Sequence, residues 1–159
     1  MDTPDPDSFS PTDFDASTFQ GPDFQAIVLL ADSAQVADGK LYILGGGLSV
    51  IGPRPQATAI ALRLAVPWDQ ANVKHDWRLE LTDQDGRQVS INDKPVSVAG
   101  QFEAGRPAGV APGTQLWVPL AINFGAMPLA AGQRFTWRLF VNDATSEGWS
   151  ATVTVRGPG

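Results

Sequence analysis

The segment Pro67–His75 carries the densest group of polar side chains in the body of the chain, and it holds the single histidine. Asp69 and His75 could form a carboxylate–imidazole pair in which the acid orients the ring for proton transfer. No serine or threonine nucleophile stands within this segment. The alternative is structural, with Asp69 capping a turn and His75 bonded to backbone. We therefore expect no catalytic residue, and we take Trp68, Asp69 and His75 as candidate ligand contacts.

Other kinds of site chemistry find little support in the sequence. The chain has no cysteine, which excludes disulfides, thiolate nucleophiles and cysteine-rich metal sites. Gly45-Gly46-Gly47 lacks the following helix and the Lys-Ser/Thr of a phosphate loop, so we expect it to mark a bulge or a close backbone approach. Asp83, Asp85 and Asp93 flank a predicted hairpin, but their spacing matches no calcium loop. We expect neither a metal nor a cofactor.

The charge of the chain is unevenly distributed. Of the 17 acidic residues, six lie between residues 1 and 24, a stretch with no lysine or arginine, so the remainder holds 11 acidic and 11 basic residues. A neutral body offers no cluster of cations to neutralise phosphates, and we expect no nucleic-acid partner. The N-terminus lacks the charge and apolar run of a signal peptide, and no stretch reaches the roughly 18 apolar residues of a membrane span. We expect a bacterial-type cytoplasmic protein with no membrane contact.

Residues 1–23 are predicted to form an acidic extended tail, because Asp, Pro, Ser and Thr dominate and few apolar residues offset the entropy of ordering. Within it, Phe9, Phe14 and Phe19 recur every five residues, and Phe24 continues the series. This period fits neither a helical face nor a strand face. One interpretation is a flexible solubilising segment with incidental Phe. The other is an arm whose Phe side chains bind a groove on its own body, on a sister subunit or on another protein.

Residues 24–157 are predicted to form one domain, a single antiparallel β-sandwich of the immunoglobulin-like kind with about nine strands. Alternation is clearest in Ala57–Val66, where one face carries Ile and Leu and is expected to be core. Asp38-Gly39 predicts a hairpin turn, with Lys40–Leu44 running back along Phe24–Leu30. Only Pro67–Lys74 has room for a helical turn. The corner tyrosine of many immunoglobulin-like domains has no counterpart, since Phe135 stands in the corresponding stretch.

The motifs Leu-Leu-Ala-Asp at 29–32, Gly-Lys-Leu-Tyr-Ile-Leu-Gly-Gly-Gly at 39–47, Val-Pro-Trp at 66–68 and Val-Pro-Leu-Ala-Ile-Asn-Phe-Gly at 118–125 occur together in this chain. In combination they resemble a family of uncharacterised bacterial proteins described as a domain of unknown function. The resemblance covers roughly residues 26–156 and leaves out the tail. It implies a small β-rich bacterial protein and supplies no activity or catalytic residues.

Three functions are open from the sequence. We prefer a non-catalytic binding or structural module that assembles with itself or docks on a larger bacterial assembly, with Phe9, Phe14 and Phe19 as partner contacts. The second is a small-molecule or carbohydrate-binding module in which some of the five tryptophans line a pocket or platform; alternation places most of them in the core. An enzyme that uses Asp69 and His75 is the least favoured.

Overall fold

The computed structural model describes residues 24–158, which form an all-β body with a single short 3-10 helix. The 3-10 helix η2 (Trp68–Gln70) lies where the sequence predicted a helical turn. The twelve strands of this part of the chain are β1 (Gln25–Ala31), β2 (Ser33–Ala37), β3 (Lys40–Leu44), β4 (Val50–Ile51), β5 (Thr58–Val66), β6 (His75–Asp83), β7 (Ser90–Ile91), β8 (Lys94–Pro95), β9 (Ser97–Phe102), β10 (Leu116–Phe124), β11 (Arg134–Val141) and β12 (Ser150–Val155).

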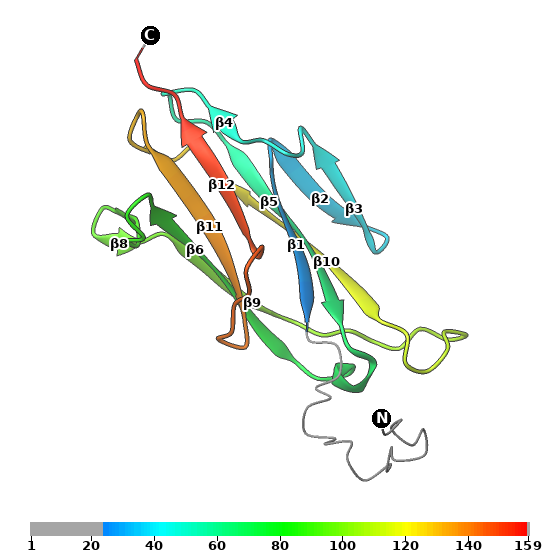
Figure 1. Ribbon diagram of the computed structural model, residues 1–159. Helices are drawn as coiled ribbons and strands as arrows, with labels where there is room; N and C mark the ends of the chain where they lie inside the picture. The colour runs from blue at the N-terminus through cyan, green and yellow to red at the C-terminus, as the bar shows by residue number, and fades with distance from the viewer. Residues whose placement is uncertain (1–23, 159) are drawn as a thin grey trace, which may run out of the picture.

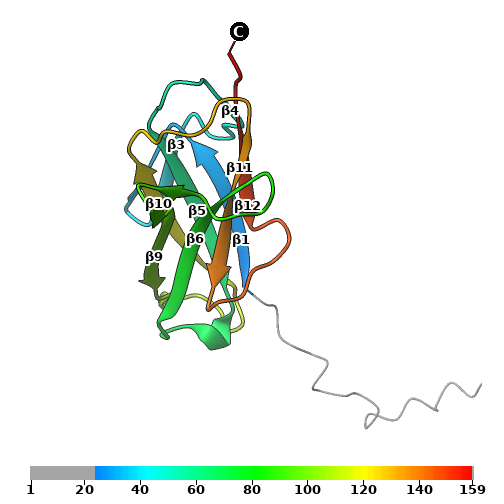
Figure 2. The same ribbon diagram turned by 90° about the vertical axis from the view of Figure 1, so that its left-hand side faces the viewer.

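Two sheets pack face to face, as Figure 1 shows, and Figure 2 views them from the side of β6 and β11. The three-stranded sheet has the order β1-β5-β10, and the five-stranded sheet has the order β4-β12-β11-β6-β9. Two small hairpins, β2-β3 and β7-β8, complete the described strands. The all-β prediction is confirmed, whereas the strand number is twelve and not nine, and β4 pairs with β12 in parallel. The immunoglobulin-like assignment stays a prediction.

The main core lies between the two sheets, because the large apolar side chains of each sheet alternate with smaller or polar ones. Ile60, Leu62 and Leu64 of β5 face Leu79 of β6 and its neighbours, all of them fully or almost fully buried. Trp137 of β11 is 1% exposed and stacks on Phe124 of β10, with ring centroids 4.6 Å apart. This aromatic pair joins the two sheets, with Phe124 at the end of β10.

The second face of β5 is also largely buried, which corrects the prediction that only one of its sides is core. Ala59 and Ala61 of that face pack against Ala34, because the β2-β3 hairpin lies across the three-stranded sheet. Figure 1 shows the hairpin on the side of β1, β5 and β10 that is away from β11 and β6. The Asn123 side chain fastens it, with Oδ1 accepting from Ala34 N at 3.2 Å and Nδ2 donating to Ala34 O at 2.8 Å.

The Asp38-Gly39 turn forms as predicted, but the strand that it joins to β3 is not the one expected. Both turn residues have positive φ, 51° and 68°, as a two-residue type I′ hairpin requires. Lys40–Leu44 pairs with Ser33–Ala37, a stretch that we expected to be a turn. β1 instead pairs with β5 along its whole length, from Gln25 opposite Ala65 to Ala31 opposite Ala59.

The glycine run after β3 marks a close backbone approach, as the sequence predicted. Gly45 has φ +64°, and a Cβ at this position would lie 2.7 Å from Asp32 Cγ. A Cβ on Gly46 would meet Ile43 Cγ2 at 2.9 Å. The chain leaves the hairpin through this tight passage, where Asp32 N also donates to Leu44 O at 3.0 Å. Residues without a side chain are therefore needed where the chain leaves the hairpin.

Candidate functional site

His75 is buried at the start of β6 and has a structural hydrogen-bond network. It is 3% exposed, and its Nε2 lies 2.9 Å from Gln70 O while its Nδ1 lies 3.1 Å from Asn142 Nδ2. Asp76 N donates to Asn142 Oδ1 at 3.0 Å, so the amide group of Asn142 points its nitrogen at the ring. Nδ1 therefore accepts and Nε2 donates to Gln70 O. The predicted bond from His75 to backbone is confirmed.

The structure does not bring Asp69 and His75 together. The His75 ring lies against Phe24 and Phe102, with centroid separations of 4.8 and 5.4 Å. Asp69 is exposed in η2, and within residues 24–158 no hydrogen bond joins it to the imidazole. The Asp69 side chain is thus in solvent, whereas the His75 ring packs against aromatic side chains.

Trp68, the third predicted ligand contact, is partly buried and covered by an arginine. Arg106 Cζ lies 4.7 Å from the centre of the Trp68 ring, and Arg106 Nη2 donates to Trp68 O at 2.7 Å. A cation over the ring occupies the face that a flat ligand would use. Trp68, Asp69 and His75 therefore lie in three different environments and do not converge on one pocket.

Most of the tryptophans belong to the core, as alternation predicted. Trp77 and Trp137 are buried, and Trp149 packs against the same core. Trp117, in contrast, is 39% exposed on the outer face of β10. Arg63 of β5 places its Cζ 3.7 Å from the centre of the Trp117 ring. The exposed tryptophan is thus half of a cation–π pair on the surface of the sheet.

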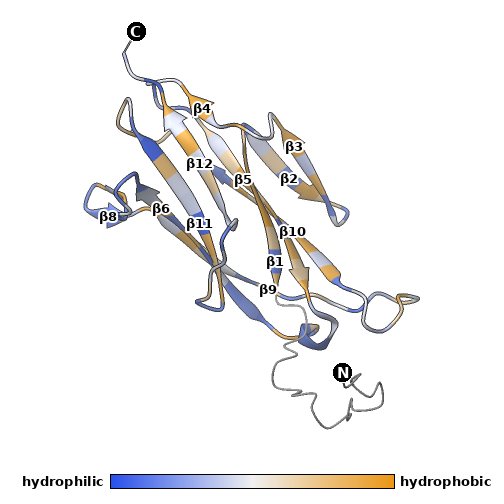
Figure 3. Ribbon diagram, viewed as in Figure 1, coloured by the Kyte–Doolittle hydropathy of each residue, from blue (hydrophilic) through white to orange (hydrophobic). Residues whose placement is uncertain are grey.

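Large apolar side chains gather on the side of the molecule formed by the outer face of the three-stranded sheet and the β2-β3 hairpin. Leu44 is 68% exposed and Tyr42 54%, and Figure 3 shows hydrophobic colouring on β1 and along the hairpin. We call this the outer apolar surface and define it by Ile27, Val36, Tyr42, Ile43, Leu44 and Trp117. The signal for it in the sequence is the run of four apolar residues from Leu41 to Leu44.

The edges of the strands on this side differ in how they are protected. β10 is an edge strand that contains Pro119, whose missing N–H hinders pairing with another strand. β3 has one neighbour among the described strands, β2, and it carries neither proline nor glycine. A short apolar edge of this kind is able to pair with a strand of another chain.

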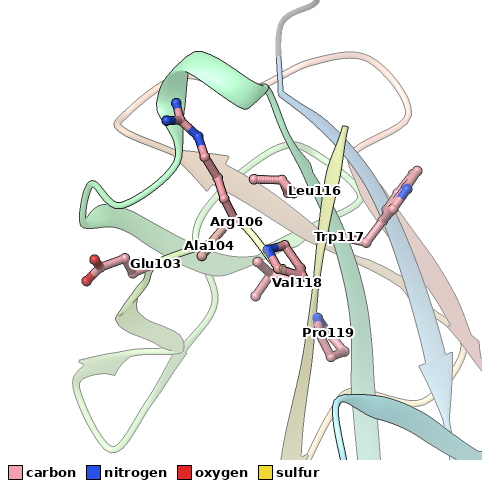
Figure 4. A pocket seen from close by; sticks show the side chains of 9 residues that line it. Glu103, Ala104, Arg106, Leu116, Trp117, Val118 and Pro119 are labelled. Atoms are coloured by element: carbon pink, nitrogen blue, oxygen red, sulfur yellow. The ribbon is translucent and has the colours of Figure 1, made fainter. Parts of the chain in front are cut away.

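Two hollows lie on either side of β10. The first, which we call the hairpin groove, has a volume of about 280 Å³ and is lined by Gly39, Lys40, Leu41, Arg63, Trp117 and Pro119. The second has a volume of about 440 Å³ and lies between residues 103–107 and residues 116–119. Figure 4 shows Leu116 and Trp117 pointing to opposite sides of β10, so that this strand separates the two hollows.

Charge on the two outer faces of the sandwich is arranged differently. Both ion pairs among residues 24–158 belong to Arg78, which contacts Glu80 at 2.7 Å and Asp143 at 2.8 Å. Burial alone would lower the pKa of Arg78, but its hydrogen bonds to the two carboxylates outweigh that effect and raise it. Arg63, on the other sheet, has no carboxylate partner within the described residues. Its guanidinium is therefore able to bind an anionic group.

Residues 24–158 contain no group of three or more His, Cys, Asp or Glu side chains placed to hold a metal ion. The one helix in the same stretch, η2, has neither the length nor the apolar character needed to cross a membrane. Phe9, Phe14 and Phe19 lie outside the described residues, so their role as partner contacts stays a prediction.

The fold and the outer apolar surface define a small all-β module of two packed sheets, with an apolar hairpin on one outer face. The chain belongs to the Family of unknown function (DUF6941), whose model matches residues 26–154. This match confirms the resemblance to an uncharacterised family. No curated protein matches the chain. The matched region starts inside β1, so the acidic segment before it lies outside the family match.

Proposed function

We propose that the protein is a non-catalytic binding or structural module of the bacterial cytoplasm. It assembles with itself or docks on a larger bacterial assembly through the outer apolar surface, and its N-terminal arm supplies part of the contact. The observation that carries this proposal is the exposure of Tyr42 and Leu44, 54% and 68%, on β3, which has β2 as its one neighbour among the described strands. Exposed apolar groups of this size on one face are typical of protein–protein contacts.

The energetics of the surface are compatible with association. Fully burying one large apolar side chain contributes about 1.5–3 kcal/mol, and six such side chains define the outer apolar surface. Because they are already partly covered, the gain per residue is smaller than that range. Backbone pairing along β3 would add hydrogen bonds, and together these terms can offset an association cost of about 4–15 kcal/mol.

The solution mass of the full-length protein, measured by light scattering, tests this proposal. We expect a mass above that of the monomer, which Leu44→Ser and deletion of residues 2–23 each lower. Val73→Ser is the matched control, because Val73 is 48% exposed in the loop between η2 and β6 and lies outside the outer apolar surface. If the wild type is monomeric, affinity capture with wild-type and Leu44→Ser protein as baits tests docking on another protein. A surface without a role would give equal masses and equal captures.

The hollow of about 440 Å³ beside β10 favours small-molecule binding as a second candidate function. Its walls combine apolar groups, such as Leu116 and Val118, with the charged side chains of Glu103 and Arg106. A sugar platform fits less well, since arginines cover the rings of Trp68 and Trp117. Ligand-dependent tryptophan fluorescence, compared between the wild type and Trp117→Leu, would detect a ligand at this place. If no candidate compound changes the spectrum, the protein-contact function is the better explanation.

A further inference from the structure

The hairpin groove joins an exposed aromatic ring with two cations. Lys40 at the start of β3 and Arg63 in β5 both line it, and Trp117 and Pro119 supply apolar walls. Ile27 extends the apolar area, because it is 51% exposed and stands opposite Arg63 in the register of β1 and β5. Asp38 in the turn directly precedes Gly39, but none of the described residues that line the groove is acidic. The groove is therefore suited to an aromatic side chain flanked by carboxylates.

The sequence contains one such element outside the described residues. Phe14 stands between Asp13 and Asp15, whereas Phe9 lies between two serines and Phe19 between Thr18 and Gln20. The volume of the groove, about 280 Å³, is enough for an aromatic ring, because cavities of about 150 Å³ bind benzene. The two carboxylates match the two cations in number and sign.

The position where the chain enters the fold allows this contact within one molecule. Gln25, the first residue of β1, stands opposite Ala65, and Ala65 stands opposite Trp117. Two strand spacings of about 4.8 Å each therefore separate β1 from β10. Phe14 precedes Phe24 by ten residues, which span up to about 33 Å when extended. A tether of this length also gives the segment a high effective concentration at its own groove.

We propose that Asp13-Phe14-Asp15 of the N-terminal arm binds the hairpin groove of its own chain, with Phe14 against the apolar wall of Leu41 and Pro119 and the carboxylates near Lys40 and Arg63. The inference rests on the proposed function for its biological meaning, since the groove borders β3, the strand that carries Tyr42 and Leu44. The hairpin groove is then the place where the arm joins the outer apolar surface.

Site-specific photo-crosslinking in the full-length protein tests the inference. Phe14 is replaced by a photoreactive benzoyl analogue of phenylalanine, and the product is digested and mapped by mass spectrometry. We expect cross-links at the mass of one chain to Lys40, Leu41, Trp117 or Pro119. The same analogue at position 9 is the matched control and should give a severalfold lower yield at the groove. Arg63→Glu should lower the yield from position 14 severalfold, whereas Arg87→Glu, an exposed arginine in the loop after β6, should leave it unchanged.

Several outcomes would overturn the inference. They are cross-links at the mass of two chains, cross-links away from the groove, and a yield from position 14 no higher than that from position 9. The cross-linking result can be distinguished from the result of the test of the proposed function. A monomer with the expected cross-links retains the inference and removes self-assembly. An oligomer that depends on Leu44 but gives no groove cross-link retains the proposed function and removes the inference.

Discussion

Replacement of Gly45 by alanine should destabilise the fold more than replacement of Gly39 by alanine, although both glycines have nearly the same backbone angle. Their φ values are +64° and +68°. Left-handed backbone costs an L-residue about 1–2 kcal/mol, and loss of unfolded-state freedom returns about 0.4–1 kcal/mol. Gly39→Ala, with open space around the new methyl group, should therefore cost about 1 kcal/mol. This variant is the matched control for backbone strain alone.

Gly45→Ala carries an additional steric cost. Its methyl group would lie 2.7 Å from Asp32 Cγ, and overpacking of this kind costs about 1–3 kcal/mol. The total is about 2–4 kcal/mol. In an Asp32→Ala background the nearest atom of residue 32 would be Cβ, at 3.2 Å, so most of the steric part should disappear. The double-mutant cycle should then show a coupling of about 1–2 kcal/mol.

Urea unfolding followed by tryptophan fluorescence measures these differences. With a slope of about 2 kcal/mol per molar, Gly45→Ala should shift the midpoint about 1 M further than Gly39→Ala. Equal shifts for the two glycine variants would show that the Asp32 side chain does not restrict this passage. A full steric cost that persists in the Asp32→Ala background would also refute the reasoning.

Two further predictions concern asparagine side chains. Asn142→Ala should lower the free energy of unfolding by about 1–3 kcal/mol, because it leaves His75 Nδ1 and Asp76 N–H without their partner; a wild-type urea midpoint would contradict this. Asn123→Ala removes both bonds to the backbone of Ala34, and it should speed amide hydrogen exchange across β2 and β3 while leaving β6 and β11 protected. Unchanged exchange in the hairpin would show that apolar packing alone holds it on the sheet.

The strands that could be predicted from the sequence are those in which apolar and polar residues alternate, because this pattern indicates one buried face. In β6 and β11 large apolar residues recur at every second position and face the main core, and Phe140 on the outer face of β11 is the exception. The period of these strands was therefore sufficient to predict them. The two-residue strands β4, β7 and β8 are too short to have a period. They account for part of the difference between nine and twelve strands.

The hairpin was harder to predict because alanine is compatible with both a buried and a solvent-facing position. Ala59 and Ala61 suggested an uncovered face, yet their small size is what allows Ala34 to approach. Ser33–Ala37 has weak strand propensity of its own, and it forms a strand because Asn123 and β3 bind its backbone. Both of these contacts come from other parts of the chain.

The surroundings of the candidate residues depend on contacts between distant positions. That His75 bonds to backbone was predicted, but its second partner, Asn142, is 67 positions away in the sequence. Arg63 and Trp117 meet diagonally across two paired strands, since Trp117 stands opposite Ala65. Strand register has to be known before such a pair can be recognised. The outer apolar surface is defined by exposure, which follows from the position of the hairpin.

The solution mass of wild-type, Tyr42→Ser/Leu44→Ser and Val73→Ser proteins, measured by light scattering over a range of concentrations, tests self-assembly through the outer apolar surface most directly. We predict an oligomer for the wild type and for Val73→Ser, and a lower mass for the Tyr42→Ser/Leu44→Ser variant. A monomer at every concentration for all three proteins, or an oligomer that the double substitution leaves intact, would contradict self-assembly through this surface.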